Sequence, residues 1–335
     1  SYTIDLARPT DDAELRRLLR DNPMTGDISL TLEREPSFFL GASIEGSPHQ
    51  TYLGRDRDGR VVGLASRSVR TVFTNGSPAR VGYLSQARLD SRYRGTRSLL
   101  RGGFRFLREL HEDGEAPYYV TSIIEDNRVA RRFFEADWPG KPTYRPWARF
   151  STLALPLLRR RKKRVEVRGA VRDDLDEIVA CLQRNLTRYQ LAPVWTAEDL
   201  TGDTTRDLKV EDFLVVARGG RVVGCLAQWD QSGFKQSVVR GYGGRIGLLR
   251  PWVNVVARLL RTPRLPSPGE PIPSRFLSHV AVDGDDPEVL LALVARAHDA
   301  ALESRRYAFV TMGFASAHPF VELLRRRFRT IEYRS

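Results

Sequence analysis

Three arginines surround a glycine in a short polar loop, and this is the clearest arrangement in the chain that could do chemistry. Arg92, Arg94 and Arg97 lie around Gly95, after an alternating apolar run and before a helical pattern that starts near Ser98. A helix N-terminus presents unpaired N–H groups and a partial positive charge, so it favours a phosphate. Glycine lets the backbone approach an anion, and arginine adds bidentate donors. This arginine loop therefore predicts a pyrophosphate site, with an ordinary strand-to-helix turn as the alternative.

Other catalytic chemistries find less support in the sequence. The five histidines are isolated and none has metal-ligand spacing, so we expect no metal site. They are His49, His111, His279, His298 and His318. No Ser-His-Asp constellation can be assembled from residue order alone. The two cysteines, Cys181 and Cys225, are too few for a structural zinc site, and as buried thiols they suit a reducing cytoplasm.

The composition is that of a two-domain protein with sizeable cores. The chain has 335 residues, of which 41% are hydrophobic. No apolar run approaches the roughly 20 residues of a membrane helix, and residues 1–12 hold no signal-peptide core. We therefore expect a cytoplasmic protein with no membrane partner.

The net charge is +13, and the run RRRKKR at residues 159–164 supplies six of these charges, so the remainder is mildly basic. We interpret this run as a solvated linker. A diffuse positive excess attracts anions without choosing among them. The lack of interleaved aromatic residues or a known reading helix disfavours nucleic acid as a partner.

The two halves of the chain repeat the same signatures. Residues 4–22 and residues 165–185 both read as a short strand, an Asp-Asp turn and an amphipathic helix. The sequence G-R-V-V-G recurs at residues 59–63 and 220–224, each time at a turn dipeptide typical of a hairpin. A spacing of about 160 residues predicts a domain duplication, since solenoid repeats are much shorter.

Each half continues as strand, helix, strand, helix, which predicts a parallel strand pair with a right-handed crossover. We therefore expect an α/β fold with two mixed sheets, each covered by helices on both faces. The expected units are an N-terminal domain at residues 1–157, a basic linker at 158–164 and a C-terminal domain at 165–335. An insertion at 242–273 holds an amphipathic helix and a Pro-rich loop. We interpret it as an interdomain brace, with a lid as the alternative. The chain would be a monomer or a homodimer.

The whole pattern resembles the GNAT superfamily of acyl-CoA N-acyltransferases, as two tandem copies that cover nearly the full chain. The resemblance rests on R-P-T-D-D at residues 8–12, the D-G-R-V-V-G hairpin at 58–63, D-x-x-Y-R-G at 90–95 and I-E-D-N-R-V-A-R-R-F-F-E at 124–135. It implies a V-shaped gap between the two middle parallel strands, in which acetyl-CoA or another acyl-CoA sits.

For the first copy, the resemblance also implies which residues hold the co-substrate. Pantetheine would pair with the end of the strand, and the pyrophosphate with N–H groups of the loop and first helical turn. Asn127 matches an asparagine that often contacts pantetheine, with the N-cap of the following helix as its alternative role. The implied CoA-binding residues are Ala87, Arg88, Leu89, Arg94, Gly95, Thr96, Arg97, Ser98, Leu99, Asn127 and Phe134.

Acyl transfer to an amine also needs a base that deprotonates the ammonium group. Glu125 follows an apolar strand beside the expected acyl position and is our candidate; its alternative role is a surface ion pair with Arg128 or Arg132. Ser85 and Gln86, on the preceding strand, are candidates to position the acyl carbonyl or a water.

The sequence also departs from the family pattern. Arg97 and Leu99 replace two small residues of the family loop, so they could crowd the phosphates, or Arg97 could contact them directly. Phe134 stands where many members have the tyrosine that protonates the CoA thiolate. The matching loop of the second copy has no arginine. It carries Asp283, Asp285, Asp286 and Glu288. These carboxylates would repel a pyrophosphate, so we expect the second copy not to bind CoA.

We therefore predict an N-acetyltransferase that works through its first copy. It would transfer an acetyl or short acyl group from acyl-CoA to a primary amine of a small molecule or peptide, by direct attack in a ternary complex. Phe134 and the altered loop favour a different class, a non-catalytic acyl-CoA-binding sensor or scaffold. A nucleic-acid-associated protein that uses residues 159–164 is a second alternative.

Overall fold

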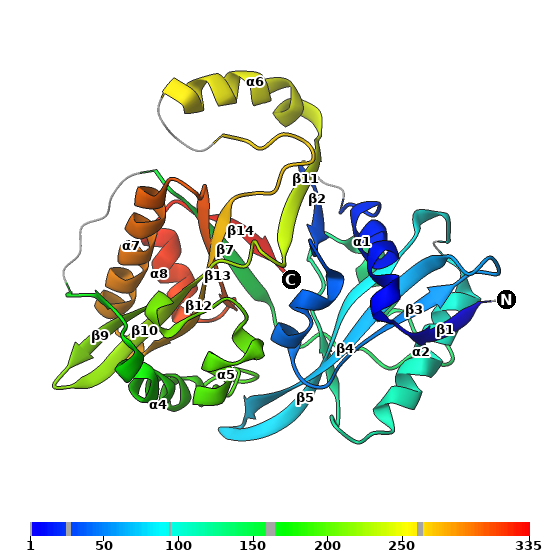
Figure 1. Ribbon diagram of the computed structural model, residues 1–335, viewed down its shortest axis with the longest axis horizontal. Helices are drawn as coiled ribbons and strands as arrows, with labels where there is room; N and C mark the ends of the chain where they lie inside the picture. The colour runs from blue at the N-terminus through cyan, green and yellow to red at the C-terminus, as the bar shows by residue number, and fades with distance from the viewer. Residues whose placement is uncertain (1, 25–27, 94, 159–164, 260–263) are drawn as a thin grey trace.

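The computed structural model describes residues 2–24, 28–93, 95–158, 165–259 and 264–335. They form two α/β halves, each built on a mixed sheet, which lie side by side (Figure 1). The predicted fold class is therefore confirmed. Arg94 and residues 159–164 of the predicted linker lie outside the described residues.

The first sheet has five strands in the order β1-β3-β4-β5-β6. All neighbours are antiparallel except β5 and β6, which are parallel as predicted. The predicted hairpin joins β3 and β4, and its turn residue Gly59 has φ +79°, which favours glycine. The strands are β1 (Thr3–Leu6), β3 (His49–Arg55), β4 (Val61–Thr74), β5 (Ser77–Leu89) and β6 (Tyr119–Thr121).

Helices cover both faces of this sheet because its side chains alternate. On β3, Leu53 packs with leucines of α1 (Asp12–Arg20), whereas Gly54 faces α2 (Arg97–His111). A Cβ at Gly54 would lie 2.5 Å from the Leu99 side chain of α2, so glycine lets this helix pack closely without a shift of that side chain. The short helix α3 (Arg128–Glu135) follows β6.

The second sheet has seven strands in the order β14-β7-β13-β12-β10-β9-β8, and β12 and β13 form its parallel pair. Leu214 and Val216 of β9 face one core, and Phe213 and Val215 face a second core on the other side. The strands are β7 (Phe150–Pro156), β8 (Arg168–Gly169), β9 (Phe213–Arg218), β10 (Arg221–Trp229), β12 (Ser274–Val282), β13 (Phe309–Ala315) and β14 (Ile331–Arg334). The helices are α4 (Leu175–Leu186), α5 (Ala197–Thr201), α7 (Pro287–Ser304) and α8 (Pro319–Arg327).

Strand β7 does not follow the expected division of the chain. It precedes residue 157, yet it is hydrogen-bonded between β13 and β14 of the second sheet. The hydrogen-bonded sheets therefore do not divide at residue 157. Strand β7 therefore connects the two halves: it follows the first half in the chain and lies in the interior of the second sheet.

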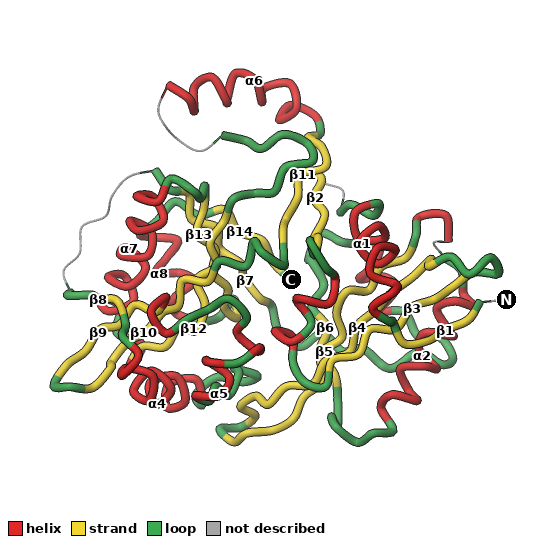
Figure 2. Tube along the Cα trace, viewed as in Figure 1, coloured by secondary structure: helices red, strands yellow, loops and turns green. Residues whose placement is uncertain are grey.

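A separate two-stranded ribbon also joins the halves. Strand β2 (Ile28–Glu33) pairs with β11 (Gln236–Tyr242), and Arg240 forms an ion pair with Glu33 across the ribbon. The ribbon thus joins the halves through β11, which directly precedes the insertion. Its helix α6 (Gly244–Leu259) instead projects from the body of the molecule (Figures 1 and 2). Among the described helices, none is long and apolar enough to cross a membrane.

Candidate functional site

The parallel strands of the first sheet separate and leave a V-shaped opening. Their described pairing ends at Leu84 and Thr121, but β5 continues to Leu89. The β4–β5 register slips beside this point, and Gln86 takes a positive φ of +56°. A β-bulge with a strained residue bends a strand away from its neighbour. The edge of β5 beyond Leu84 therefore faces the opening without a strand partner among the described residues.

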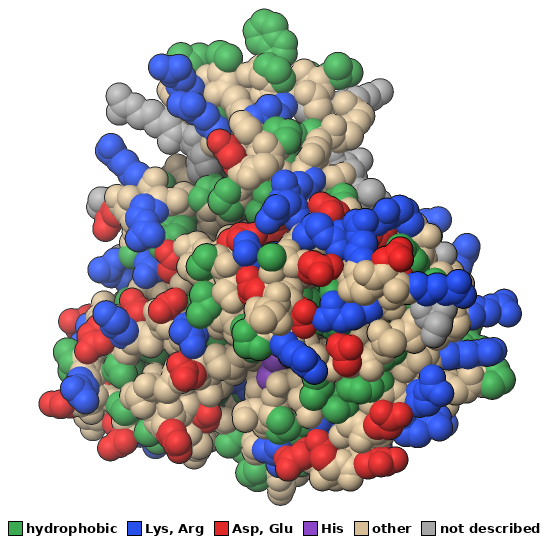
Figure 3. Space-filling model, turned by 45° about the vertical axis from the view of Figure 1, so that its right-hand side comes forward, with side chains coloured by type: hydrophobic (Ala, Val, Ile, Leu, Met, Phe, Trp, Pro, Cys, Tyr) green, Lys and Arg blue, Asp and Glu red, His purple; other side chains and the backbone are tan. Residues whose placement is uncertain are grey.

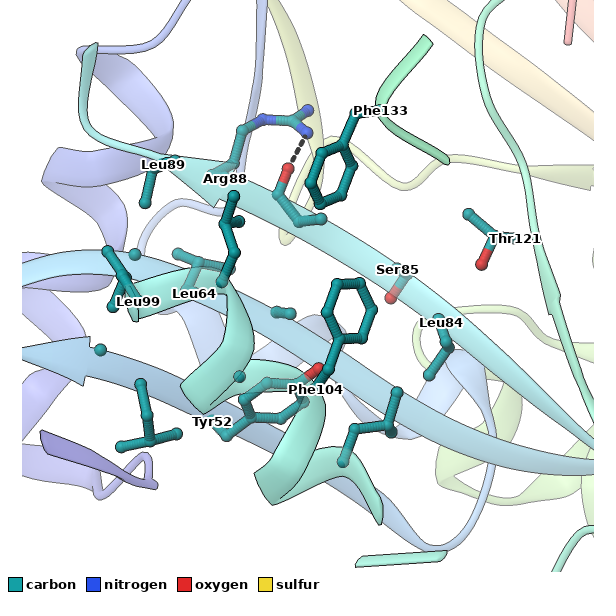
Figure 4. A pocket seen from close by; sticks show the side chains of 18 of the residues that line it. Tyr52, Leu64, Leu84, Ser85, Arg88, Leu89, Leu99, Phe104, Thr121 and Phe133 are labelled. Carbon is teal, nitrogen blue, oxygen red and sulfur yellow. Dashed lines mark hydrogen bonds between the residues drawn. The ribbon is translucent and has the colours of Figure 1, made fainter. Parts of the chain in front are cut away.

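A mainly apolar pocket lies in this opening, between the end of β5, α2 and α3 (Figure 4). Ser85 of β5 and Thr121 of β6 both line it (Figure 4). The apolar lining includes Tyr52, Leu64, Leu84, Phe104, Leu107 and Phe133. An elongated ligand with an apolar segment and a polar head would fit a pocket of this character.

The N-terminus of α2 opens beside this pocket and offers free donors. Among the described residues, no side chain caps the helix at Thr96. Gly95 has φ +83° and open space around it, while the side chains of Arg97 and Ser98 are exposed. Leu99 is buried against Gly54, so its side chain points away from any anion bound at the helix end. The Leu99 side chain therefore packs on the sheet and leaves the exposed loop to Arg97 and Ser98.

Two other arginines near the loop are already engaged. The Arg92 guanidinium donates to Asp90 at 2.8 and 3.1 Å and lowers the pKa of that carboxyl to about 2. Arg88 lies between β5 and Phe133, and its guanidinium donates to the Ala87 carbonyl at 2.9 Å (Figure 4). That carbonyl belongs to the strand end expected to pair with pantetheine, so Arg88 lies at the expected pantetheine position.

The structure holds Ser85 and Gln86 through a residue that the sequence did not single out. The Ser85 hydroxyl donates to Glu45 at 2.6 Å, and the Gln86 amide donates to the same carboxylate at 3.3 Å. Glu45 also pairs with Arg34, which is only 3% exposed. Burial alone would raise the pKa of Glu45, but Arg34 and the Ser85 hydroxyl lower it below its ordinary value. Glu45 is therefore a fixed anion that orients both predicted residues.

Polar groups from both halves extend this cluster. His49 lies 4.0 Å from Glu45, and its ring nitrogens contact Ser68 and Thr51 at 2.8 and 3.2 Å. Burial lowers the pKa of His49, although Glu45 opposes the shift. Lys235, from the second half, is solvent-exposed, but the protein around it lowers the pKa of its ammonium. Figure 3 shows a histidine recessed beside a basic side chain in the hollow between the halves.

Glu125 and Asn127 lie on the loop before α3 and do not line the pocket. The Glu125 carboxylate is 3.8 Å from Arg149, a different arginine from the two expected as partners, and its side chain is 38% exposed. The Asn127 side chain accepts from the Ala130 N–H at 3.1 Å and caps α3, which is its alternative role. Asn127 therefore positions α3 in this structure.

Phe134 lines the pocket and packs against an unexpected tyrosine. The ring of Tyr144 lies 4.8 Å from the ring of Phe134, and both side chains line the same pocket. Burial raises the pKa of Tyr144, so its hydroxyl stays protonated at neutral pH. The pocket therefore contains a tyrosine hydroxyl although Phe134 carries none.

The second half repeats the strand geometry but fills the opening. A register shift and a positive φ of +50° at His279 mark the same bulge in β12. Asp286 caps α7 by accepting from the N–H groups of Glu288 and Val289, at 2.9 and 3.4 Å. Pro287, the first residue of α7, has no N–H to offer. The free donors of α2 have no counterpart here, since a carboxylate of the chain already occupies them.

The interior of the second half is also closed. Gly63 and Gly224 occupy the same position in the repeated G-R-V-V-G segments. A Cβ on Gly63 would lie near Leu99 of α2, and one on Gly224 near Val289 of α7, so Leu99 and Val289 are equivalent positions. Four residues later in each helix, Gly103 is equivalent to Leu293. Leu293 is fully buried in the core, whereas Gly103 lines the pocket of the first half. Two acidic residues of the loop form ion pairs with α4 and the residues after it: Asp283 binds Arg184 at 2.8 Å and Asp285 binds Arg188 at 2.8 Å.

Gly95→Val tests the arginine loop. A β-branched side chain at φ +83° costs roughly 1–2 kcal/mol and distorts the helix entrance, so we expect acetyl-CoA to bind about tenfold more weakly. Gly220→Val is the matched control, because Gly220 has φ +79° and equally open surroundings in the second half. Calorimetric titration of both variants measures the affinity. Equal losses of acetyl-CoA affinity in the two variants would show that the arginine loop is not part of the binding site.

Two residues near the pocket that sequence reasoning missed, Glu45 and Tyr144, share one property. Each lies in a segment without a strong periodic pattern, and each reaches the site through a tertiary contact. A buried carboxylate has no signature of its own in the sequence.

Comparison with known proteins identifies the fold. No protein-family model matches the sequence, and no curated protein is significantly similar to it. A GCN5-related glucosamine N-acetyltransferase region of a fungal multi-domain β-N-acetylglucosaminidase is 16% identical, with a TM-score of 0.60. That match covers 100% of this chain and 38% of the fungal chain, so the present chain spans well under half of that protein.

Two structures of Saccharomyces cerevisiae N-myristoyltransferase with bound myristoyl-CoA are also similar. Each is 11% identical, with TM-scores of 0.62 and 0.60, and the matches cover 100% of this chain and 78% and 82% of the yeast chains. Likeness at these identities shows the fold, and the chain has the fold of the GNAT-type N-acyltransferases.

Proposed function

We propose that this chain, with its GNAT-type fold, is an acyl-CoA N-acyltransferase that works through its N-terminal copy alone. The acyl group would be acetyl or another short acyl group, and the acceptor a primary amine of a small molecule or peptide. The C-terminal copy would complete the acceptor side of the cleft and hold the first copy in place.

One observation carries the proposal: the two copies differ at the points where a CoA would bind. Among the described residues, the first has an open pocket, a helix N-terminus that no side chain caps and a strand edge without a partner. The second has Leu293 in the matching interior position and Asp286 on the matching helix N-terminus. A fold that keeps these features in one copy and fills them in the other supports a single CoA site.

The pocket residues suit a direct transfer. A neutral amine would attack the thioester carbon, so that a C–N bond forms and the C–S bond breaks with its electron pair on the CoA sulfur. The amine loses one proton and the thiolate gains one, which gives an amide and free CoA. Free N–H groups at the β5 bulge would polarise the thioester carbonyl, and the rest of the catalysis would be positioning.

We assign distinct roles to the carboxylates and to Tyr144. Glu45 orients Ser85 and Gln86, because its lowered pKa and its ion pair with Arg34 make it a poor proton acceptor. Glu125, outside the pocket lining, would accept the amine proton through a water. Tyr144, protonated and inside the pocket, would donate a proton to the thiolate.

The experiment that tests the proposal combines binding with turnover. Calorimetric titration with acetyl-CoA comes first, followed by a thiol-release assay over a panel of primary amines. We expect binding and amine-dependent release of CoA. Binding without release on any amine would favour the acyl-CoA sensor, the alternative that Phe134 supports. Absence of acetyl-CoA binding would rule out both the acyltransferase and the sensor.

Replacing the two proton-transfer groups should slow turnover and leave co-substrate binding intact. Glu125→Gln and Tyr144→Phe keep the side-chain size and remove the acid–base group, so we expect kcat to fall about tenfold for each. Glu135→Gln and Tyr118→Phe, which change exposed residues of the same types, serve as controls. Steady-state kinetics separate kcat from KM for acetyl-CoA. Unchanged kcat in either test variant would remove that residue's role.

A further inference from the structure

Helix α6 is amphipathic, but its polar face packs on the protein and its apolar face is exposed. Its inner face is polar or small: Arg250 donates to Ser267 at 2.9 Å, Asn254 donates to the Leu265 carbonyl at 3.1 Å, and Ala257 is buried. These three residues follow one another at helical spacing. The polar face therefore packs on the segment that returns from the helix, and the apolar face is left for solvent.

The outer face of α6 carries large apolar side chains along the whole helix. Leu248 is 79% exposed, Trp252 72% and Leu259 77%. Leu249, Val253, Val255 and Val256 are also exposed. Figure 3 shows hydrophobic side chains at the tip of this projection. Monomeric proteins seldom expose so continuous an apolar surface unless it meets another phase or a partner.

The charge around this face indicates what covers it. Residues 242–273 contain five arginines and a single acidic residue, Glu270. Of these arginines, Arg258 and Arg264 are exposed beside the apolar face. A surface of apolar side chains that include a tryptophan, with an excess of positive charge, complements anionic lipid headgroups over an acyl layer.

The position of α6 suits the same occupant. The helix runs across the end of the molecule, beyond both halves and remote from the body of each sheet (Figure 1). Its outer face can therefore lie along a flat surface while the pocket of the first half stays open. The expectation of no membrane partner rested on the length of apolar runs, which concerns helices that span a bilayer and not those that lie on it.

We propose that α6 is a membrane-surface anchor that docks the protein onto anionic lipid headgroups, with its apolar outer face in the boundary between headgroups and acyl chains. Leu248, Trp252 and Leu259 would supply the apolar contact. Arg258 and Arg264 would supply the preference for anionic lipid. The anchor is independent of the acyltransferase assignment, because it uses no residue of the pocket.

Vesicle sedimentation with the full chain tests the proposal. We expect binding to vesicles of phosphatidylcholine mixed with phosphatidylglycerol, weakening as salt rises, and much weaker binding to phosphatidylcholine alone. The double variant Leu248→Asp with Trp252→Asp should bind at least about tenfold more weakly. Val171→Asp is the control, since Val171 is 55% exposed on another element. Both changes are at the surface, so near-wild-type thermal melting should accompany them.

Three outcomes would overturn the anchor. The first is no binding of the wild-type chain to anionic vesicles. The second is equal binding to both vesicle types, which would remove the role of Arg258 and Arg264. The third is a wild-type dimer in sedimentation velocity that becomes monomeric in the double variant without vesicle binding, which would show that a second copy covers the face.

Discussion

Gly103→Phe is expected to abolish acetyl-CoA binding, with an affinity loss of at least about a thousandfold, while the protein stays folded. Gly103 lies in α2 and lines the pocket, and a Cβ built on it meets only Tyr52, at 3.9 Å. A phenyl ring on that Cβ therefore enters the space that the acyl group and pantetheine would occupy. Overlap with a ligand in a packed site costs several kcal/mol.

The fold should tolerate this change because it removes a glycine from a helix interior. Replacing glycine by another residue there gains up to about 1 kcal/mol of helix stability. Gly103→Ala is the matched control: it gains the same helical preference and leaves the pocket open. Calorimetric titration gives the affinities, and thermal melting reports the fold. Wild-type affinity in a well-folded Gly103→Phe variant would place the CoA site elsewhere.

Glu45→Gln is expected to lower both activity and stability, while acetyl-CoA still binds. The substitution leaves the Arg34 charge buried without its anion, which costs about 3 kcal/mol of unfolding free energy. It also loosens Ser85 and Gln86 at the bulge, so we expect kcat to fall about a hundredfold. The exposed pair of Arg80 with Glu115 provides the control Glu115→Gln, expected to change stability by less than about 1 kcal/mol.

The pH dependence distinguishes this ion pair from simple loss of packing. The folded-state pKa of Glu45 is lowered below the ordinary value of 4.5, so its contribution to stability is fully present above that value. It is lost as pH falls through the folded-state pKa. The stability difference between wild type and Glu45→Gln, measured by denaturant unfolding, should therefore shrink as pH falls below 4.5. A difference that stays constant with pH would contradict the role of the Glu45 charge.

The sequence was informative wherever the structure is local. The repeated G-R-V-V-G segments predicted both hairpins, because a turn dipeptide and alternating apolar residues act within a few positions. The order of strands and helices predicted two parallel pairs, since a strand–helix–strand connection has one favoured handedness. The fold class followed from these local signals.

Long-range features were beyond the same reasoning. The sequence of β7 fits an interior strand of either sheet, and only tertiary packing decides that it pairs with β13 and β14. Glu45 reaches Ser85 across forty residues of chain, so no spacing rule indicates the contact. An amphipathic pattern was visible in α6, but the pattern does not tell which face meets the protein.

Hydrogen–deuterium exchange with and without acetyl-CoA tests most directly the claim that only the first copy binds the co-substrate. We expect acetyl-CoA to slow exchange at the backbone amides of residues 85–89 and 95–99, at the strand edge and the start of α2. We expect no change at the matching residues 279–289, where Asp286 already caps α7. Protection of residues 279–289, or of neither segment at saturating acetyl-CoA, would contradict the claim.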